Sequence, residues 1–246
     1  MKKLILLCMA GVMMMGTVGC AMTGAYEKKA ERRLEDRYGI SFQVERVISR
    51  NIFDGYYEVL AYPEDDPDML VRASVDFEGE GESDDYAIKL LCRKISDRVA
   101  RKMDNLNGTY LINTVPALPV YGFFDTNMTI EQYMEKFPMD SFRICINYNP
   151  DELDVNALYR VLADAAADLD CLEQNSYICL HLVSGRDLAG IQQYLKEHDK
   201  EYADYVWNEP CYLVGNFDFA CGKFTMAESE IKSTIAGFRE KYVKEW

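Results

Sequence analysis

Side chains able to do acid–base or metal chemistry are few and scattered in this chain. Its two histidines are His181, two residues after Cys179 on an apolar run, and His198, on the apolar stripe of an expected helix. Metal sites need three or four clustered ligands, and the spacing supplies no third ligand beside Cys179 and His181. We therefore interpret both histidines as packing residues, with a metal pair at Cys179 and His181 as the alternative. The sequence predicts no metal site and no cofactor.

Paired carboxylates are the remaining source of general acid–base chemistry. They occur at Asp65 and Asp66, in an acidic turn, and at Asp84 and Asp85, ahead of an expected helix. The motifs GxSxG, HExxH, GxxxxGK[ST] and GxGxxG are all missing from the sequence, which disfavours the common hydrolases, metalloproteases and nucleotide enzymes. We predict no catalytic residues, and an enzyme that uses scattered carboxylates stays open as the alternative.

The acidic segment from Asp76 to Asp85 also raises the question of calcium binding. An EF-hand loop that began at Asp76 would need Glu at its twelfth position, and the residue there is Ala87. We expect this segment to be a solvated turn whose last acids lie favourably at a helix N-terminus.

Six of the eight cysteines follow residue 20, at Cys92, Cys145, Cys171, Cys179, Cys211 and Cys221. No CxxC pair occurs, which disfavours zinc ribbons and thioredoxin-type sites. Gly215-Asn216 predicts a hairpin turn between strands at 212–214 and 217–219. That hairpin would bring Cys211 and Cys221 together at its open end, so they form a candidate disulfide. The alternative is that the cysteines are buried free thiols, acting as small apolar residues.

The composition is that of a folded acidic protein. The 246 residues are 49% apolar and 12% aromatic, and the net charge is −14. Such a body is repelled by nucleic-acid phosphates and by anionic lipid headgroups, so we predict no nucleic-acid partner.

We predict the α+β class, with a first α-β-β-β-α unit over residues 26–114. Gly39 ends its first helix, and Asp54-Gly55 predicts a hairpin between its first two strands. Alternating polarity marks the third strand, and an apolar stripe marks the second helix. The expected elements are a helix, three strands and a helix, near residues 26–38, 42–45, 56–62, 69–77 and 84–106. They form a meander sheet with helices on one face. Asn107-Gly108 ends the second helix, and a further strand is expected over residues 109–114.

A proline-containing connection over residues 115–127 separates a second unit over 128–246. Pro116 and Pro119 cannot lie inside a helix or an interior strand. The second unit alternates helices and strands, which is typical of an α/β layer. We expect helices near 129–137, 149–169, 188–205 and 225–242, and strands near 142–148, 176–184 and 211–221. Thr129 and Gln132 predict a capping box at the start of the first of these helices, and Asn149-Pro150 predicts the start of the second.

The first twenty residues have the pattern of a secretory signal. Lys2 and Lys3 precede an uncharged apolar run over 4–15, and Thr17-Val18-Gly19-Cys20 follows. This end resembles the lipobox of bacterial lipoproteins, although Thr17 replaces the usual Leu. The resemblance implies that residues 1–19 are removed and that Cys20 is acylated as the mature N-terminus, followed by a short spacer over 20–25. An ordinary signal peptide with a chance cysteine is the alternative.

The resemblance implies a protein anchored by lipid at the extracytoplasmic face of the cell membrane. Its body is similar in style to uncharacterised lipoproteins of Gram-positive bacteria, without a specific family. We predict a binding or interaction module for an envelope protein, a peptide or a sugar, because 17 tyrosines could supply recognition surfaces if they are exposed. A cell-envelope enzyme and an accessory subunit of an envelope complex are the alternatives. Ligand and oligomeric state cannot be read from the sequence.

Overall fold

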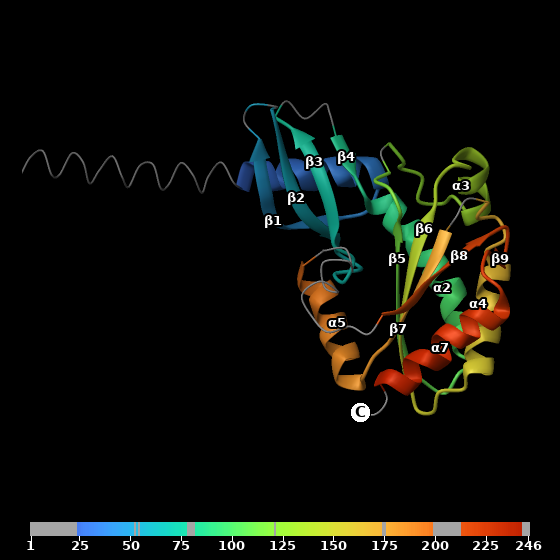
Figure 1. Cartoon of the computed structure of the whole chain (residues 1–246). Helices are drawn as coiled ribbons and strands as arrows, with labels where there is room; N and C mark the ends of the chain where they lie inside the picture. The colour runs from blue at the N-terminus through green and yellow to red at the C-terminus, as the bar shows by residue number, and fades with distance from the viewer. Residues whose placement is uncertain are drawn as a thin grey trace, which may run out of the picture. The chain divides into compact units, whose positions relative to one another are not determined.

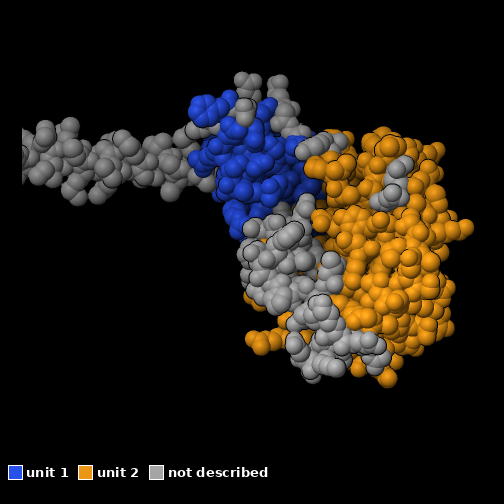
Figure 2. Space-filling model, viewed as in Figure 1, with its two compact units in different colours: residues 1–86 blue, residues 87–246 orange. Residues whose placement is uncertain are grey.

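The computed structural model describes residues 24–51, 53, 55–77, 82–120, 122–173, 176–198 and 213–242. The chain divides into two compact units, Met1–Tyr86 and Ala87–Trp246, which Figure 2 distinguishes by colour. Each unit contains its own β-sheet, and helices and strands occur in both, which confirms the predicted α+β class. Within the described ranges, no helix is long and apolar enough to cross a bilayer.

The sheet of the first unit is an antiparallel meander (Figure 1). Its strands β1 (Phe42–Asn51), β2 (Tyr56–Pro63), β3 (Val71–Asp76) and β4 (Glu82–Asp84) neighbour one another in chain order. The three predicted strands and the predicted hairpin between β1 and β2 are confirmed. The short strand β4 is an addition, because residues that the sequence placed in a loop pair with the outer edge of β3.

A helix over residues 24–38 covers one face of this sheet (Figure 1). Its apolar residues Ala30 and Leu34 are fully or almost fully buried, and the ring of Tyr26 packs at 4.7 Å on the ring of Tyr57. The helix ends at Gly39 as predicted, since its left-handed φ of +70° suits glycine after the last turn. A narrow apolar stripe at i,i+4 spacing is therefore enough to dock this highly charged helix on the sheet.

The second unit is built on a five-stranded mixed sheet. Strands β5 (Gly108–Pro116), β6 (Phe142–Pro150), β7 (Ser176–Leu182), β8 (Leu213–Ala220) and β9 (Lys223–Phe224) lie in chain order, and only β6 and β7 pair in parallel. The helices are α2 (Tyr86–Met103), α3 (Ile130–Lys136), α4 (Val155–Asp168), α5 (Gly185–His198) and α7 (Glu228–Tyr242). This alternation of helices and strands was predicted.

The helices divide between the two faces of this sheet (Figure 1). On one face, Ser96 of α2 shares a hydrogen bond of 2.8 Å with Thr114 of β5, and Thr234 of α7 lies beside Gly215 of β8. Helix α4 packs with α7 on that side. On the opposite face, α5 contacts β5 and β6. The sheet is therefore covered on both faces, as expected for strands with long apolar runs.

The division between the units differs from the predicted connection at 115–127. Strand β5 pairs with β6 over its whole length, from Gly108 opposite Pro150 to Pro116 opposite Phe142. This ladder places residues 108–116 in the second sheet, whereas the sequence assigned residues up to 114 to the first unit. Pro116 is tolerated because it is the last residue of an edge strand.

The predicted helix start at Asn149-Pro150 is wrong, because strand β6 is longer than expected. Both residues extend β6 opposite β5. Helix α4 is capped instead by Asp154, whose carboxylate accepts hydrogen bonds from the amides of Asn156 and Ala157 at 2.9 and 3.0 Å. A side-chain cap at Asp154 satisfies the same free amides that the predicted start would have satisfied.

The predicted hairpin turn at Gly215-Asn216 is wrong. Both residues lie inside β8, opposite Leu180 and Cys179. The chain turns instead at Cys221-Gly222, where φ values of 48° and 74° form the tight two-residue loop between β8 and β9. Burial explains why β8 continues past Gly215-Asn216, because the strand places Phe217 and Phe219 in the core at 1% and 0% exposed.

Gly108 and Gly237 give a matched test of this backbone. Gly108 has φ +132°, and a Cβ there would lie 2.4 Å from the carbonyl oxygen of Asn149. We expect Gly108→Ala to lower the free energy of unfolding by about 2–4 kcal/mol. Gly237→Ala, at an open position in α7, should raise it by about 0.5–1 kcal/mol. Urea denaturation measures both, and equal effects would contradict this account of the β5–β6 ladder.

Candidate functional site

The residues singled out from the sequence lie in separate places. Cys20 and Cys211 lie outside the described residues, so the lipidation and the Cys211–Cys221 disulfide remain predictions. The hairpin that suggested this disulfide is not formed, and Cys221 lies in the β8–β9 turn as a free thiol. His181 lies in β7, and His198 is the last residue of α5. Within the described ranges, no three His, Cys, Asp or Glu side chains meet as metal ligands.

Asp84 anchors the first helix of the first unit. The residue is 8% exposed. Its carboxylate pairs with the guanidinium of Arg37 and accepts a hydrogen bond of 2.6 Å from the Tyr38 hydroxyl. The amide of Tyr86 donates to the same carboxylate at 3.0 Å. Burial, together with the bond to Asp84, raises the pKa of Tyr38. Because these donors surround the carboxylate, its geometry is that of a structural anchor rather than a general base.

The other predicted carboxylates also have local structural surroundings. Asp85 accepts a hydrogen bond of 2.8 Å from the amide of Arg72, which ties the end of β4 to β3. Asp65 is exposed in the turn after β2, where the amide of Asp66 donates to the carbonyl of Pro63 at 3.0 Å. Asp85 therefore supports the pairing of β4 with β3, and Asp65 and Asp66 lie in a turn closed by a backbone hydrogen bond.

A shallow, open groove of about 410 Å³ runs along β1 in the first unit. Residues 45–50 of the strand and Glu27 of the first helix line it. β1 is an edge strand that pairs with β2 on one side, and two register shifts interrupt that pairing. The groove carries both signs of charge, from Glu27, Glu45, Arg46 and Arg50, and Ile48 is 39% exposed beside them. An extended segment of another chain could pair with such an edge.

In the second unit, polar and sulfur side chains form three rows across the face of the sheet that α5 covers. Residues paired across strands point to the same face. Asn147 and His181 form one row at 0% and 2% exposed, and Arg143 and Tyr177 form another. The full rows are Val115–Arg143–Tyr177–Asp218, Asn113–Cys145–Cys179–Asn216 and Leu111–Asn147–His181, which the strand register continues to Leu213.

Two thiols lie side by side in the middle row. Cys145 and Cys179 are partners across β6 and β7, and Ile191 of α5 packs on them. The Cys179 thiol donates to Oδ1 of Asn216 at 3.0 Å. Hydrogen bonding between the thiols raises the pKa of Cys145 and lowers that of Cys179, and burial raises that of Cys145 further. Both are free thiols in the structure, and at 1% and 7% exposed they are shielded from oxidants in solvent.

The carboxyl ends of β6 and β7 are the usual ligand position in such a sheet, because α4 and α5 leave toward opposite faces. Here the position is filled by the protein itself. The Asn149 amide donates to Thr109 at 3.4 Å and lies 3.3 Å from the point where a Cβ on Gly185 would be. The Ser184 hydroxyl donates to Asp187 at 2.7 Å at the start of α5. Because this carboxylate already lies at the positive helix end, an anionic ligand is disfavoured there.

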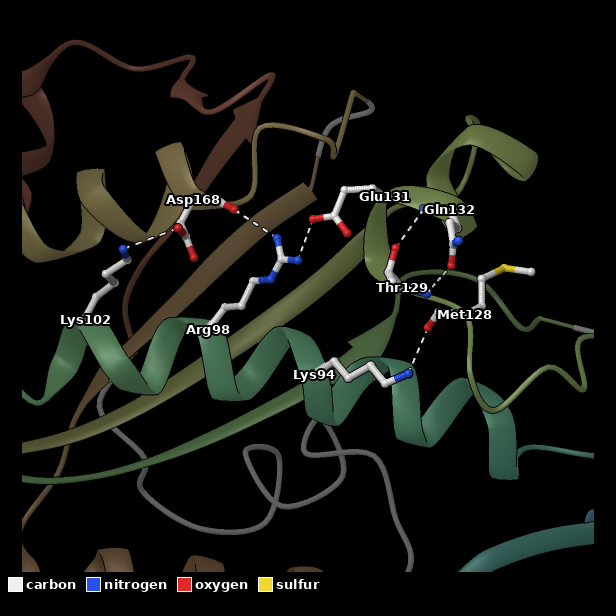
Figure 3. Close-up of polar contacts among 8 residues, drawn as sticks. All are labelled: Lys94, Arg98, Lys102, Met128, Thr129, Glu131, Gln132 and Asp168. Atoms are coloured by element: carbon white, nitrogen blue, oxygen red, sulfur yellow. Dashed lines mark hydrogen bonds and ion pairs between the residues drawn. The ribbon is translucent and has the colours of Figure 1, made fainter.

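A row of cations on α2 ties the helices of the second unit together (Figure 3). Lys94 donates to the Met128 carbonyl at 2.8 Å, and Lys102 pairs with Asp168 at 3.3 Å. Arg98 lies between them and contacts Glu131 and the backbone of the α4 end. The expected capping box at Thr129 and Gln132 is confirmed beside them. The row is therefore engaged inside the unit rather than offered to an anionic ligand.

Sequence reasoning missed the polar rows, although their signal was present. Apolar residues alternate with Arg143, Cys145 and Asn147 in β6, and the same interval separates Cys179 from His181 in β7. The alternation shows that these side chains share a face of their own strand. It does not give the register between β6 and β7, which is what places the cysteines together.

The anchoring role of Asp84 can be tested against Asp65. We expect Asp84→Ala to lower the free energy of unfolding by about 2–4 kcal/mol, because Arg37 and Tyr38 lose a buried acceptor. Asp65→Ala, in the exposed turn, should change it by less than about 0.5 kcal/mol. Urea denaturation followed by circular dichroism compares them, and a negligible effect of Asp84→Ala would refute the anchor.

Burial of His181 predicts a pH dependence of stability. Burial lowers the pKa of His181 to about 4, below its unfolded value of about 6.5. The folded state therefore resists protonation, and stability is lost as pH falls from 6.5 to 4, by up to about 3 kcal/mol. His181→Gln should remove this part of the slope. Denaturation of both proteins across that range measures the difference, and parallel curves would show that His181 does not contribute.

Comparison with known proteins supports the fold and little else. No family model and no curated protein matches the sequence. The chain is similar in structure to a DUF5037 family protein from Ruminococcus gnavus, with a TM-score of 0.61 and 14% sequence identity. The match covers 86% of this chain and 99% of that one. At this identity the similarity shows that the two proteins share a fold.

Proposed function

We propose that this chain is a lipoprotein, anchored through Cys20 at the extracytoplasmic face of the cell membrane. Support comes from the order of positive charge, apolar run and small residues before Cys20. Two or more acyl chains give stable anchoring at about 0.8 kcal/mol per buried CH₂. The acidic composition agrees with an anchor of this kind, since the protein surface itself would not hold anionic lipid.

The anchor would hold the first unit close to the membrane. Its helix begins at residue 24, four residues after Cys20. A fully extended chain gains about 3.5 Å per residue, so this spacer spans at most about 14 Å. A partner of the first unit would therefore meet it near the membrane surface, which favours a partner that is itself part of the envelope.

The groove along β1 is the observation that carries the proposed activity, which is binding an extended peptide segment of an envelope protein. The edge of β1 offers backbone groups for an added strand. Arg46, Arg50, Glu27 and Glu45 offer charges of both signs to its side chains. Ile48 offers an apolar contact at the centre of the lined segment. The accessory-subunit alternative uses the same surface, with a permanent partner.

The contacts of the predicted carboxylates make the enzyme alternative weaker. Asp84 is surrounded by donors of its own unit, and Asp85 holds the backbone of Arg72. A shallow groove with mixed charges is a poor place for chemistry that must exclude water. These features favour a binding protein over an enzyme.

Intact-mass analysis of the membrane fraction tests the anchor. We expect wild type to have the mass of residues 20–246 plus a diacylglyceryl group, and Cys20→Ala to lack that group. An unmodified, released wild type would overturn the anchor without bearing on the groove.

Site-specific photocrosslinking in the producing cells tests the groove. A photoreactive phenylalanine analogue replaces Ile48, and the control replaces Leu118, which is 74% exposed in the second unit. We expect a discrete protein adduct from position 48 alone, identified by mass spectrometry. Arg46→Glu together with Arg50→Glu should reduce that adduct at least several-fold. The same adducts from both positions, or none from position 48, would refute binding at this groove.

A further inference from the structure

Two cysteines that are distant in sequence lie at one contact of the second unit. Cys171 follows α4, and Cys221 is the first residue of the β8–β9 turn. The amide of Cys221 donates to the carbonyl of Leu172 at 3.0 Å. A Cβ on Gly222 would lie 3.1 Å from Cβ of Asp170. The residues on both sides of Cys171 therefore contact the turn that contains Cys221.

Local packing holds both segments in place. Leu169 and Leu172 are fully buried, so the chain around Cys171 is fixed to the core at two points. The turn has little freedom, because both its residues have positive φ and Gly222 approaches Ala167 and Asp170 closely. The side chain of Cys171 is half-buried and that of Cys221 is exposed. A thiol-reactive partner can therefore reach one member of the pair from solvent.

We propose that Cys171 and Cys221 form a disulfide bond that fastens the β8–β9 turn to the end of α4. This inference rests on the extracytoplasmic location proposed above, because disulfides persist in oxidising compartments. It replaces the Cys211–Cys221 pair expected from the sequence, whose hairpin the structure does not form.

The bond forms by exchange with an external disulfide, such as oxidised glutathione or an envelope oxidoreductase. The thiolate of exposed Cys221 attacks one sulfur, releases the other as a thiol, and gives a mixed disulfide. The Cys171 thiolate then attacks Sγ of Cys221 and displaces the second thiol. The two cysteines are oxidised, the external disulfide is reduced to two thiols, and the two cysteine protons go to them. Burial raises the pKa of Cys171 and so lowers its share of thiolate, which makes the exposed thiol of Cys221 the one that reacts first.

The other thiols of this unit form a contrast. Cys145 and Cys179 are 1% and 7% exposed, so an oxidant in solvent does not reach them in the folded protein. They should stay reduced under conditions that oxidise Cys171 and Cys221. After denaturation they should therefore be alkylated, whereas Cys171 and Cys221 should not.

Oxidation of full-length protein, purified in detergent and equilibrated in glutathione redox buffer, tests the pair independently of cellular location. The protein is denatured without reductant, alkylated and digested, and linked peptides are identified by mass spectrometry. We expect one link, between the peptides of Cys171 and Cys221. Cys145→Ser should retain it, whereas Cys171→Ser should leave Cys221 alkylated. Alkylation of both cysteines in oxidised wild type, or a link from Cys221 to Cys211, would overturn the proposal.

Thermal unfolding gives a second readout. The bond closes a loop of about 50 residues, so its reduction should lower Tm by roughly 5–15 °C. The Cys171→Ser protein should unfold at the temperature of reduced wild type, and added reductant should not change it. A reductant effect of equal size in Cys171→Ser would show that another bond is responsible and would overturn the proposal.

Discussion

The parallel pairing of β6 with β7 is the constraint on which the second unit depends. Adjacent parallel strands cannot be joined by a tight turn, so the chain must cross over through α4. That helix joins α2 and α7 on one face, where the apolar residues of the sheet are buried. The opposite face is left to α5 and carries Cys145, Cys179 and His181. The register of these two strands therefore decides which polar side chains meet.

In the first unit, the corresponding constraint is a buried charge. An ionised carboxylate removed from water needs partners, and Asp84 finds them in Arg37, Tyr38 and the backbone of Tyr86. Those partners come from the first helix and from the start of α2, so satisfying one charge fixes the helix to the sheet. The need of a buried carboxylate for partners, which can also indicate a catalytic group, here explains a structural contact.

Local patterns predicted much of the fold because their causes are local. The end of the first helix at Gly39 and the capping box at Thr129 depend on a few neighbouring residues, and both are observed. Predictions failed where a long-range ladder outweighed a local signal. Pairing with β5 extends β6 through Asn149-Pro150, and pairing with β7 extends β8 through Gly215-Asn216. Each of these signals describes a turn that would form if no neighbouring strand were there.

The candidate site residues were harder to predict for the same reason. Cys171 and Cys221 contain no common motif, and their proximity depends on the turn at Cys221-Gly222 meeting the end of α4. The β1 groove likewise depends on which strand lies at the edge of the first sheet. Strand order and register are properties of the whole sheet, so spacing within one segment cannot reveal them.

The distribution of cations connects the composition to the proposed surface. Although the net charge is −14, Lys94, Arg98 and Lys102 are engaged with partners inside their own unit. Arg46 and Arg50 line the open groove together with two glutamates, and the guanidinium of Arg50 also lies 5.2 Å from the centroid of the Tyr26 ring. Mixed charges at a surface fix the orientation and register of a partner more than they add affinity. Affinity at this groove would then come mainly from backbone pairing along β1 and from the apolar contact at Ile48, while the charges select which segment binds.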